Sequence, residues 1–147
     1  MARKLLRILG VVLLLALLVV GGALLVLWVL GPPTYDDYEP EAFAMQVEGD
    51  PAVGKRIAEL TCVRCHFDPE TDALAGRSLG SEYAALGTAY ASNITRDDVR
   101  GIGAWSEPAL VMLLRSGVHP QRKTLLPPYM PYLPNLADAD LGHLLAY

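Results

Sequence analysis

The chain has 147 residues, of which 52% are hydrophobic and 19% charged, and its formal net charge is −4. The charges are unevenly divided, because residues 31–147 hold all 16 acidic residues but only nine of the 12 basic ones. An acidic segment of this kind excludes electrostatic binding of nucleic acid. It favours docking on a basic partner surface, unless the charge serves solubility alone.

An uncharged apolar run lies near the N-terminus, directly after a basic cluster. Residues 8–30 carry no charge and follow Arg3, Lys4 and Arg7. As a helix this run is about 34 Å long, enough to cross a hydrocarbon core of about 30 Å. Flanking basic residues favour a cytoplasmic N-terminus. We therefore expect residues 1–30 to form a single-pass transmembrane anchor that contacts membrane lipid through residues 8–30.

A cleaved signal peptide is the alternative interpretation of this run. Signal peptides have an apolar region of about 7–15 residues and a small-x-small cleavage site. The run here is longer, and the sequence from Trp28 to Pro33 offers no such site. A retained anchor is therefore the prediction.

A linker is predicted for residues 31–49, because this segment is rich in proline and acidic residues and has no apolar period. A compact domain is predicted over residues 50–147. Its first helix is expected to start with Asp50 as N-cap and Pro51 in the first turn. The helix should run to about Leu60. Its expected buried residues are Gly54, Ile57, Ala58 and Leu60.

The most informative motif follows this helix: Cys62-Val63-Arg64-Cys65-His66. A Cys-x-x-Cys-His sequence is the attachment pattern of c-type haem. Two thiols one helical turn apart can each bond one vinyl group of the same porphyrin, and the adjacent histidine can bind its iron. We expect one covalent haem c, held by Cys62 and Cys65, with His66 as iron ligand. The other ring nitrogen of His66 should donate to a backbone carbonyl of the following loop.

Haem attachment of this kind takes place on the exported side of bacterial membranes. The motif therefore predicts a periplasmic domain on a bacterial inner-membrane anchor. A redox dithiol and half of a zinc site are the alternatives. The strand-helix-strand context of a thioredoxin-like dithiol is missing. The sequence has no further cysteine, and His119 and His143 lie 24 residues apart, unlike the close histidine pair of common zinc modules.

The rest of the domain is predicted to consist of loops and two more helices. Residues 67–103 are rich in Gly, Ala and Ser and should be mostly loop. A helix is expected from Ser106 as N-cap to Arg115, with Gly117 as its C′ residue. A proline-rich loop and a short helix from about Asp138 follow. Since so small a domain has a thin core, the prediction is a single all-α domain wrapped around one haem and preceded by one transmembrane helix.

The sixth ligand of the iron has five candidates in the sequence: Met45, Met112, Met130, His119 and His143. Met130 is favoured, because the prolines of Pro127-Pro128-Tyr129-Met130-Pro131-Tyr132 restrict the free loop and hold a weak thioether ligand in position. Met112 lies among leucines and is expected in the core. His143 is expected to face solvent. His119 is a rival ligand, in a loop before a proline.

Further motifs occur in a fixed order after the attachment motif. They are Leu74-Ala75-Gly76, Ala91-Ser92-Asn93-Ile94-Thr95, Gly101-Ile102-Gly103-Ala104-Trp105-Ser106, Arg115-Ser116-Gly117-Val118, Tyr129-Met130-Pro131-Tyr132 and the segment from Asp140 to Tyr147. With them, residues 50–147 resemble class I c-type cytochromes. More narrowly, they are similar to the haem domains of alcohol-dehydrogenase-type cytochrome c subunits. The resemblance covers about two thirds of the chain.

The resemblance implies roles for particular residues. It implies Met130 as the distal ligand of the iron. It also implies that Trp105 and Asn93 lie near the haem edge, where they bind a propionate or order the loop. Core packing is the alternative role for Trp105.

The resemblance also implies a helix crossing, in which Gly54 lets the first helix approach the last one near Leu144 and Tyr147. Two departures from the family pattern stand against these matches. The family's subunits usually carry several haems, whereas this chain has one attachment motif. A serine usually precedes the last helix, where this chain has Ala137, so Asp138 is the candidate cap.

The sequence thus predicts a membrane-anchored monohaem cytochrome c that transfers single electrons on the exoplasmic side and is not an enzyme. Its expected partners are subunits of a respiratory or photosynthetic membrane complex, which act as electron donor and acceptor. The alternative is a c-haem gas sensor or peroxide-reducing enzyme with a displaceable sixth ligand. Such a protein needs polar distal groups, for which His119 is the candidate.

Overall fold

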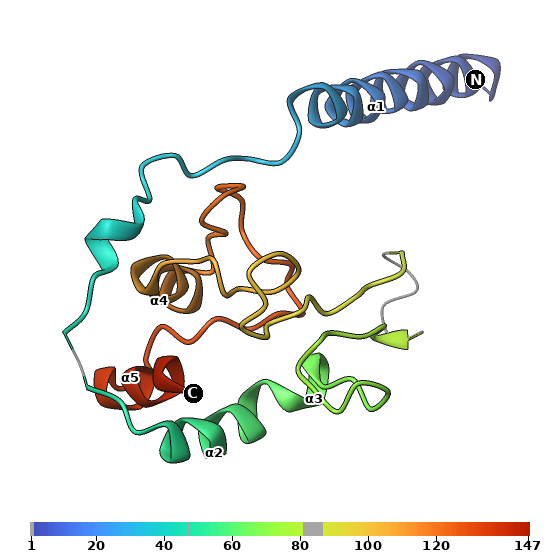
Figure 1. Ribbon diagram of the computed structural model, residues 1–147. Coiled ribbons are helices and arrows are strands. Elements are labelled where there is room, and N and C mark those ends of the chain that lie inside the picture. Colours follow the sequence, from blue (N-terminus) through green and yellow to red (C-terminus); the bar gives the residue numbers. More distant parts are fainter. Residues whose placement is uncertain (1, 47, 81–86) are drawn as a thin grey trace. The chain divides into compact units, whose positions relative to one another are not determined.

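The computed structural model describes residues 2–46, 48–80 and 87–147 (Figure 1). The chain divides into two compact units, Met1–Tyr35 and Asp36–Tyr147. Within the described ranges the chain forms helices and loops with isolated β-bridges and no strand. The helical character predicted from the sequence is therefore confirmed for these residues. The wrapping of a domain around haem stays a prediction.

The first unit contains the long helix α1 (Ala2–Leu30), which has no acidic residue in its first turn and no basic residue in its last. Of the described helices, α1 alone is long and apolar enough to cross a membrane, with a mean hydropathy of 3.0 over its most apolar window. An N-terminal signal sequence can also satisfy these criteria of length and composition, so α1 is a candidate membrane span. Met1, part of the predicted anchor of residues 1–30, lies outside the described residues.

Among its described residues, the second unit contains four α-helices and one short 3₁₀ helix. These are η1 (Pro40–Phe43), α2 (Pro51–Thr61), α3 (Val63–His66), α4 (Glu107–Ser116) and α5 (Asp138–Ala146). Helix α2 packs on α5 and is followed directly by α3, while α4 contacts both η1 and α5 (Figure 1).

The compact unit begins at Asp36, whereas the sequence places the start of the domain at residue 50. Side-chain and backbone contacts account for the difference. The η1 helix packs on α4. Lys123 Nζ donates to the Tyr38 carbonyl oxygen at 2.6 Å and lies 3.5 Å from a Glu39 carboxylate oxygen. The start of this unit has no apolar periodicity, and it is attached to the rest of the unit by the contacts of Lys123 and by the packing of η1 on α4.

Helix α2 starts as its sequence predicts. Asp50 is the N-cap, and its Oδ1 accepts a hydrogen bond from the Ala52 N–H at 2.8 Å. The Asp50 N–H donates in turn to His143 Nδ1 on α5, also at 2.8 Å. His143 is half-buried and bonded, which differs from the solvent-facing position expected of it.

The buried face of α2 is narrower than predicted. Gly54 and Ala58 are buried and Ile57 is half-buried, but Leu60 is 86% exposed, so its predicted burial is wrong. Each residue advances about 100° around an α-helix, so Leu60 lies about 200° from Ala58. The face of Gly54 and Ala58 is therefore not the face on which Leu60 lies.

Helix α4 ends as predicted and packs in the core. Gly117 follows it in the left-handed region, with φ 73°. Met112 is fully buried, which confirms its predicted core position, and Leu141 of α5 is fully buried too. Ser106 occupies the N-cap position, but its side chain makes no capping hydrogen bond.

Helix α5 begins differently from the prediction that Asp138 is its cap. Asp138 is the first helical residue, and Ala137 occupies the N-cap position without a side-chain hydrogen bond. The Asp138 carboxylate instead accepts from Arg115 Nη2 at 2.6 Å. The Asp138 carboxylate, which the local sequence predicts to cap α5, therefore forms an ion pair with Arg115 of α4.

Candidate cofactor site

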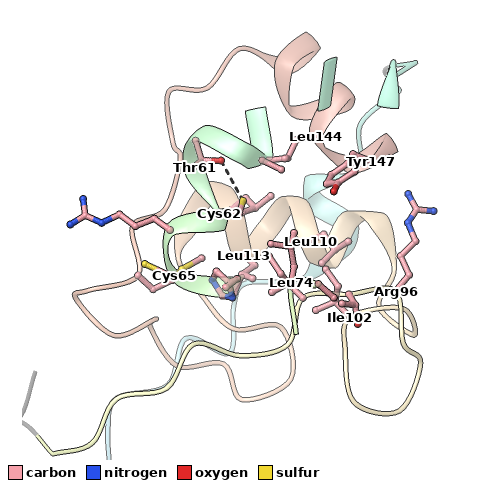
Figure 2. A pocket seen from close by; sticks show the side chains of 18 of the residues that line it. Thr61, Cys62, Cys65, Leu74, Arg96, Ile102, Leu110, Leu113, Leu144 and Tyr147 are labelled. Carbon is pink, nitrogen blue, oxygen red and sulfur yellow. Dashed lines mark hydrogen bonds between the residues drawn. The ribbon is translucent and has the colours of Figure 1, made fainter. Parts of the chain in front are cut away.

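The Cys-x-x-Cys-His motif folds as a helical turn at the end of α2. The Cys62 N–H bonds the Ala58 carbonyl at 2.7 Å, and the His66 N–H bonds the Cys62 carbonyl at 2.9 Å. Both cysteines are free thiols, and both line one cavity together with His66. Figure 2 shows Cys62 and Cys65 from the same helical segment. The turn therefore presents two thiols and an imidazole to a single space.

Burial raises the pKa of the Cys62 thiol above its ordinary value. The neighbouring Thr61 hydroxyl, 3.3 Å from the sulfur, lowers this pKa in part, and the nearby Cys65 adds to the increase. The Ile57 carbonyl oxygen, 2.7 Å from Thr61 Oγ1, is the other acceptor available to the single hydrogen of this hydroxyl, and it ties Thr61 to α2. The Cys62 thiol is therefore protonated at neutral pH.

His66 is a buried polar side chain with a fixed tautomer. Its exposed fraction is 6%, and its Nδ1 lies 2.7 Å from the carbonyl oxygen of Ser92. Because a carbonyl oxygen can only accept, Nδ1 carries the hydrogen, and in the neutral ring this leaves the lone pair on Nε2. The predicted hydrogen bond from this ring to a loop carbonyl is confirmed. An imidazole oriented in this way is a ready metal ligand.

Backbone pairing between two loop segments brings Ser92 to His66. The Gly76 N–H donates to the His66 carbonyl at 2.8 Å, and the Ile94 N–H donates to the Leu74 carbonyl at 2.9 Å. Gly76 has φ 83°, and a Cβ placed on it would lie 2.3 Å from the Ala91 carbonyl oxygen. Only glycine fits this conformation and this approach. Gly76 therefore helps to set the position of the Ser92 carbonyl.

The cavity has a volume of about 1550 Å³, which exceeds the roughly 300–1000 Å³ of common small-molecule pockets. Much of its wall is aliphatic and comes from the two loops, α4 and α5 (Figure 2). The aliphatic lining residues beyond α2 are Leu74, Leu79, Ile94, Ile102, Leu110, Leu113, Leu114, Leu133, Leu144 and Leu145. Such a wall suits a large apolar plate.

The cavity brings together five of the six predicted site residues: Cys62, Cys65, His66, Trp105 and Met130. Asn93 is not in the lining given by the described residues. Its Oδ1 accepts from the Thr95 N–H at 2.8 Å and from the Thr95 hydroxyl at 2.7 Å. Asn93 therefore orders the loop through which Ile94 and Thr95 reach the cavity.

The rival sixth ligands do not reach the cavity lining. His119 packs edge-on against Trp105, with ring centroids 5.1 Å apart. Its Nδ1 accepts from the N–H groups of Gln121 at 3.3 Å and Arg122 at 3.2 Å. Partial burial lowers the pKa of His119, and the charge of Arg122 lowers it further. A neutral ring bonded in this way lies behind Trp105 rather than in the cavity.

Two arginines at the cavity were missed by the sequence analysis. Arg77 Nη2 donates to the Arg64 carbonyl and Arg96 Nη2 to the Ala146 carbonyl, each at 2.9 Å, and both residues are among those that line the cavity. They lie in loops without helical or motif spacing, so no local pattern marks them. The leucines of α4 were foreseeable, since its apolar face is periodic.

The donor set fits a covalently held haem. Two free thiols can form the thioether bonds, and the oriented Nε2 of His66 can bind iron. Met130, whose side chain is a thioether, is among the residues that line the same cavity, and the aliphatic walls match the apolar face of a porphyrin.

No family model matches the chain. It is 36% identical over 97 residues to one of the subunits of nicotinate dehydrogenase of Pseudomonas putida, which is 64% of this chain and 8% of that protein. It is 32% identical over 142 residues to a diheme cytochrome c-type protein of Cereibacter sphaeroides, 90% of this chain and 45% of that protein. It is 33% identical over 98 residues to the cytochrome c subunit of the quinone alcohol dehydrogenase of Gluconobacter oxydans, 64% of this chain and 20% of that protein.

The chain spans less than half the length of each of these relatives. Two of the three carry the name cytochrome c, and these similarities support a c-type cytochrome.

Proposed function

We propose that this chain is a membrane-anchored c-type cytochrome with one haem, which carries single electrons on the exoplasmic side of a bacterial inner membrane. The observation that carries the proposal is the convergence of Cys62, Cys65, an oriented His66 and Met130 on one aliphatic cavity. The names of the relatives support electron transfer. The chain contains one attachment motif, and the proposal is therefore one haem.

Each site residue has a distinct task in this proposal. Cys62 and Cys65 would hold the haem covalently, His66 would bind the iron through Nε2, and Met130 would supply the second protein ligand of the iron. When bound, the haem supplies an iron that changes reversibly between the ferrous and ferric states. The Ser92 carbonyl fixes the orientation of the His66 ring. A thioether ligand favours the ferrous state and raises the reduction potential.

The position of His119 favours a carrier over a gas sensor or a peroxide-reducing enzyme. An enzyme of that kind needs a polar group beside an open iron. His119, the candidate for that role, is bonded by its Nδ1 to two backbone N–H groups and packs behind Trp105. With His66 and Met130 both serving as ligands, the chain offers no open position to a substrate.

The anchor and the charge suggest the setting in which the electrons move. Helix α1 is long and apolar enough to span a bilayer. The acidic excess of residues 31–147 favours a basic docking surface on the partner. Two relatives are named as subunits of dehydrogenases. We therefore propose that the partners are subunits of a membrane-bound dehydrogenase or respiratory complex, which pass electrons to and from this domain.

Covalent attachment is the test of the proposal. The chain is expressed in a bacterium that attaches c-type haem, and the membrane fraction is run on a denaturing gel stained for haem. We expect the band to retain the haem stain and the mass of the protein to exceed that of the polypeptide by one haem. Cys62→Ala/Cys65→Ala should abolish the stain and the excess mass. A folded wild-type protein that loses its haem on denaturation would overturn the proposal. An excess of two haems would refute the count of one.

A further inference from the structure

Arg115, in the last turn of α4, has a guanidinium group bonded on several sides. Its side chain is 17% exposed. Nη1 donates to the carbonyl oxygens of Leu133 at 3.2 Å and Pro134 at 3.1 Å, and also to that of Leu136. Nη2 donates to Asp138 Oδ1 at 2.6 Å. One side chain therefore connects α4 to four residues of a single segment.

All four acceptors lie within eight residues after Met130. This segment contains Pro131 and Pro134, which have no N–H group to donate. A loop of this kind cannot build a regular backbone ladder, and its carbonyl groups need donors from elsewhere. The guanidinium supplies them in a planar fork, which a lysine ammonium cannot reproduce. The loop is therefore held by the side chain of α4.

The same helix forms a wall of the cavity through Leu110, Leu113 and Leu114. The Leu114 carbonyl also accepts from the Leu133 N–H at 2.5 Å. A Cβ on Gly117 would lie 3.1 Å from Tyr132 Cδ1, so the loop also packs closely on the end of α4. Fixing the loop to α4 therefore fixes Met130 relative to the cavity wall.

We propose that Arg115 is a positioning residue for Met130: its bonds to the carbonyls of residues 133–136 keep the loop closed and the thioether at the iron. The inference rests on the proposed role of Met130 as sixth ligand. A thioether binds iron weakly, so the closed loop has to keep it in place. An external ligand binds only the fraction of molecules whose loop is open, and its apparent affinity is proportional to that fraction.

The test measures the apparent affinity of imidazole for the ferric, full-length holoprotein in detergent. Imidazole binding is monitored by the loss of the far-red sulfur-to-iron band. Arg115→Gln removes the fork, and Asp138→Asn is the matched control that removes the ion pair and leaves the carbonyl bonds. We expect Arg115→Gln to raise the affinity at least about tenfold and Asp138→Asn to change it by less than about threefold. If Arg115→Gln does not accumulate with haem, Arg115→Lys takes its place under the same criterion.

The spectrum of the wild-type protein distinguishes a failure of the positioning role of Arg115 from a failure of Met130 as iron ligand. If it shows the far-red band and Arg115→Gln binds imidazole with wild-type affinity, the positioning role is wrong and the role of Met130 stands. Equal effects of Arg115→Gln and Asp138→Asn would likewise overturn it, because the ion pair alone would then account for the result. If the wild type lacks the band, the ligand assignment fails and the inference fails with it.

Discussion

Gly54 of α2 lies against His143 of α5 so closely that a Cβ on Gly54 would be 1.9 Å from the His143 carbonyl oxygen. The same Cβ would lie 3.0 Å from the Cβ of Tyr147. The family resemblance implies this crossing of the two helices, with Tyr147 near the point of contact. Because α2 leads into the thiols and α5 supplies Leu144 to the cavity wall, the crossing joins two sides of the cavity.

Gly54→Ala should therefore destabilise the domain. The new methyl group meets backbone atoms that cannot rotate away, and overpacking of this kind costs about 1–3 kcal/mol or more. Thermal unfolding of the holoprotein, followed by circular dichroism, measures the effect. Gly21→Ala on α1 is the matched control, because nothing lies within 4 Å of its Cβ. Equal melting temperatures for wild type and Gly54→Ala would contradict the close approach.

Met130→Ala should open the iron to external ligands. We expect loss of the far-red band, a lower reduction potential and carbon monoxide binding to the ferrous protein at least about tenfold faster. His119→Ala is the control, and it should leave all three properties unchanged, because His119 does not line the cavity. Loss of the band in His119→Ala with Met130 intact would reverse the assignment and favour gas binding or peroxide chemistry.

His119 should make stability depend on pH near neutrality. Its pKa in the folded protein is lowered, mainly by burial and further by Arg122. The unfolded state therefore binds the proton of His119 more readily than the folded state. The contribution of His119 to the free energy of unfolding is complete above the unfolded pKa of about 6.5, and it is lost as the pH falls through the lower pKa of the folded state. His119→Asn keeps an acceptor for the N–H groups of Gln121 and Arg122 but does not titrate. The difference in melting temperature between wild type and variant should change from pH 8 to pH 5. A constant difference would refute this titration.

A fragment of residues 36–147 should be more stable than a fragment of residues 50–147. The shorter fragment lacks η1 and leaves Lys123 without the Tyr38 carbonyl and the Glu39 carboxylate. A loss of about 1 kcal/mol lowers the melting temperature of a domain of this size by about 4 °C or more. Both fragments are compared with haem attached. Equal melting temperatures would show that residues 36–49 do not contribute to the domain.

Local sequence signals predicted the features that depend on local chemistry. Asp50 caps α2, Gly117 ends α4 in the left-handed region, and the Cys-x-x-Cys-His motif forms a helical turn. Each of these requires a residue type at a fixed offset, which sequence displays directly. The fully buried Met112 likewise followed from its apolar neighbours on one helix.

Features that depend on distant partners could not be read in the same way. Asp138 was assigned to a helix cap, but Arg115, 23 residues away, takes its carboxylate. The apolar character of Leu60 predicts burial, but Leu60 is 86% exposed, while α5 lies against α2 at Gly54. The partner of a carboxylate and the burial of a side chain depend on which elements pack together, and local sequence patterns do not predict this packing.

The acceptor for the ring of His66 is a main-chain atom, the carbonyl oxygen of Ser92. Any amino acid at position 92 provides that oxygen, and the Ser92 side chain is not part of the bond. Substitutions there can accumulate over evolution without a change in the orientation of the imidazole. A mutational scan that replaces side chains one at a time would therefore pass over position 92, although it holds the imidazole of the attachment motif in place.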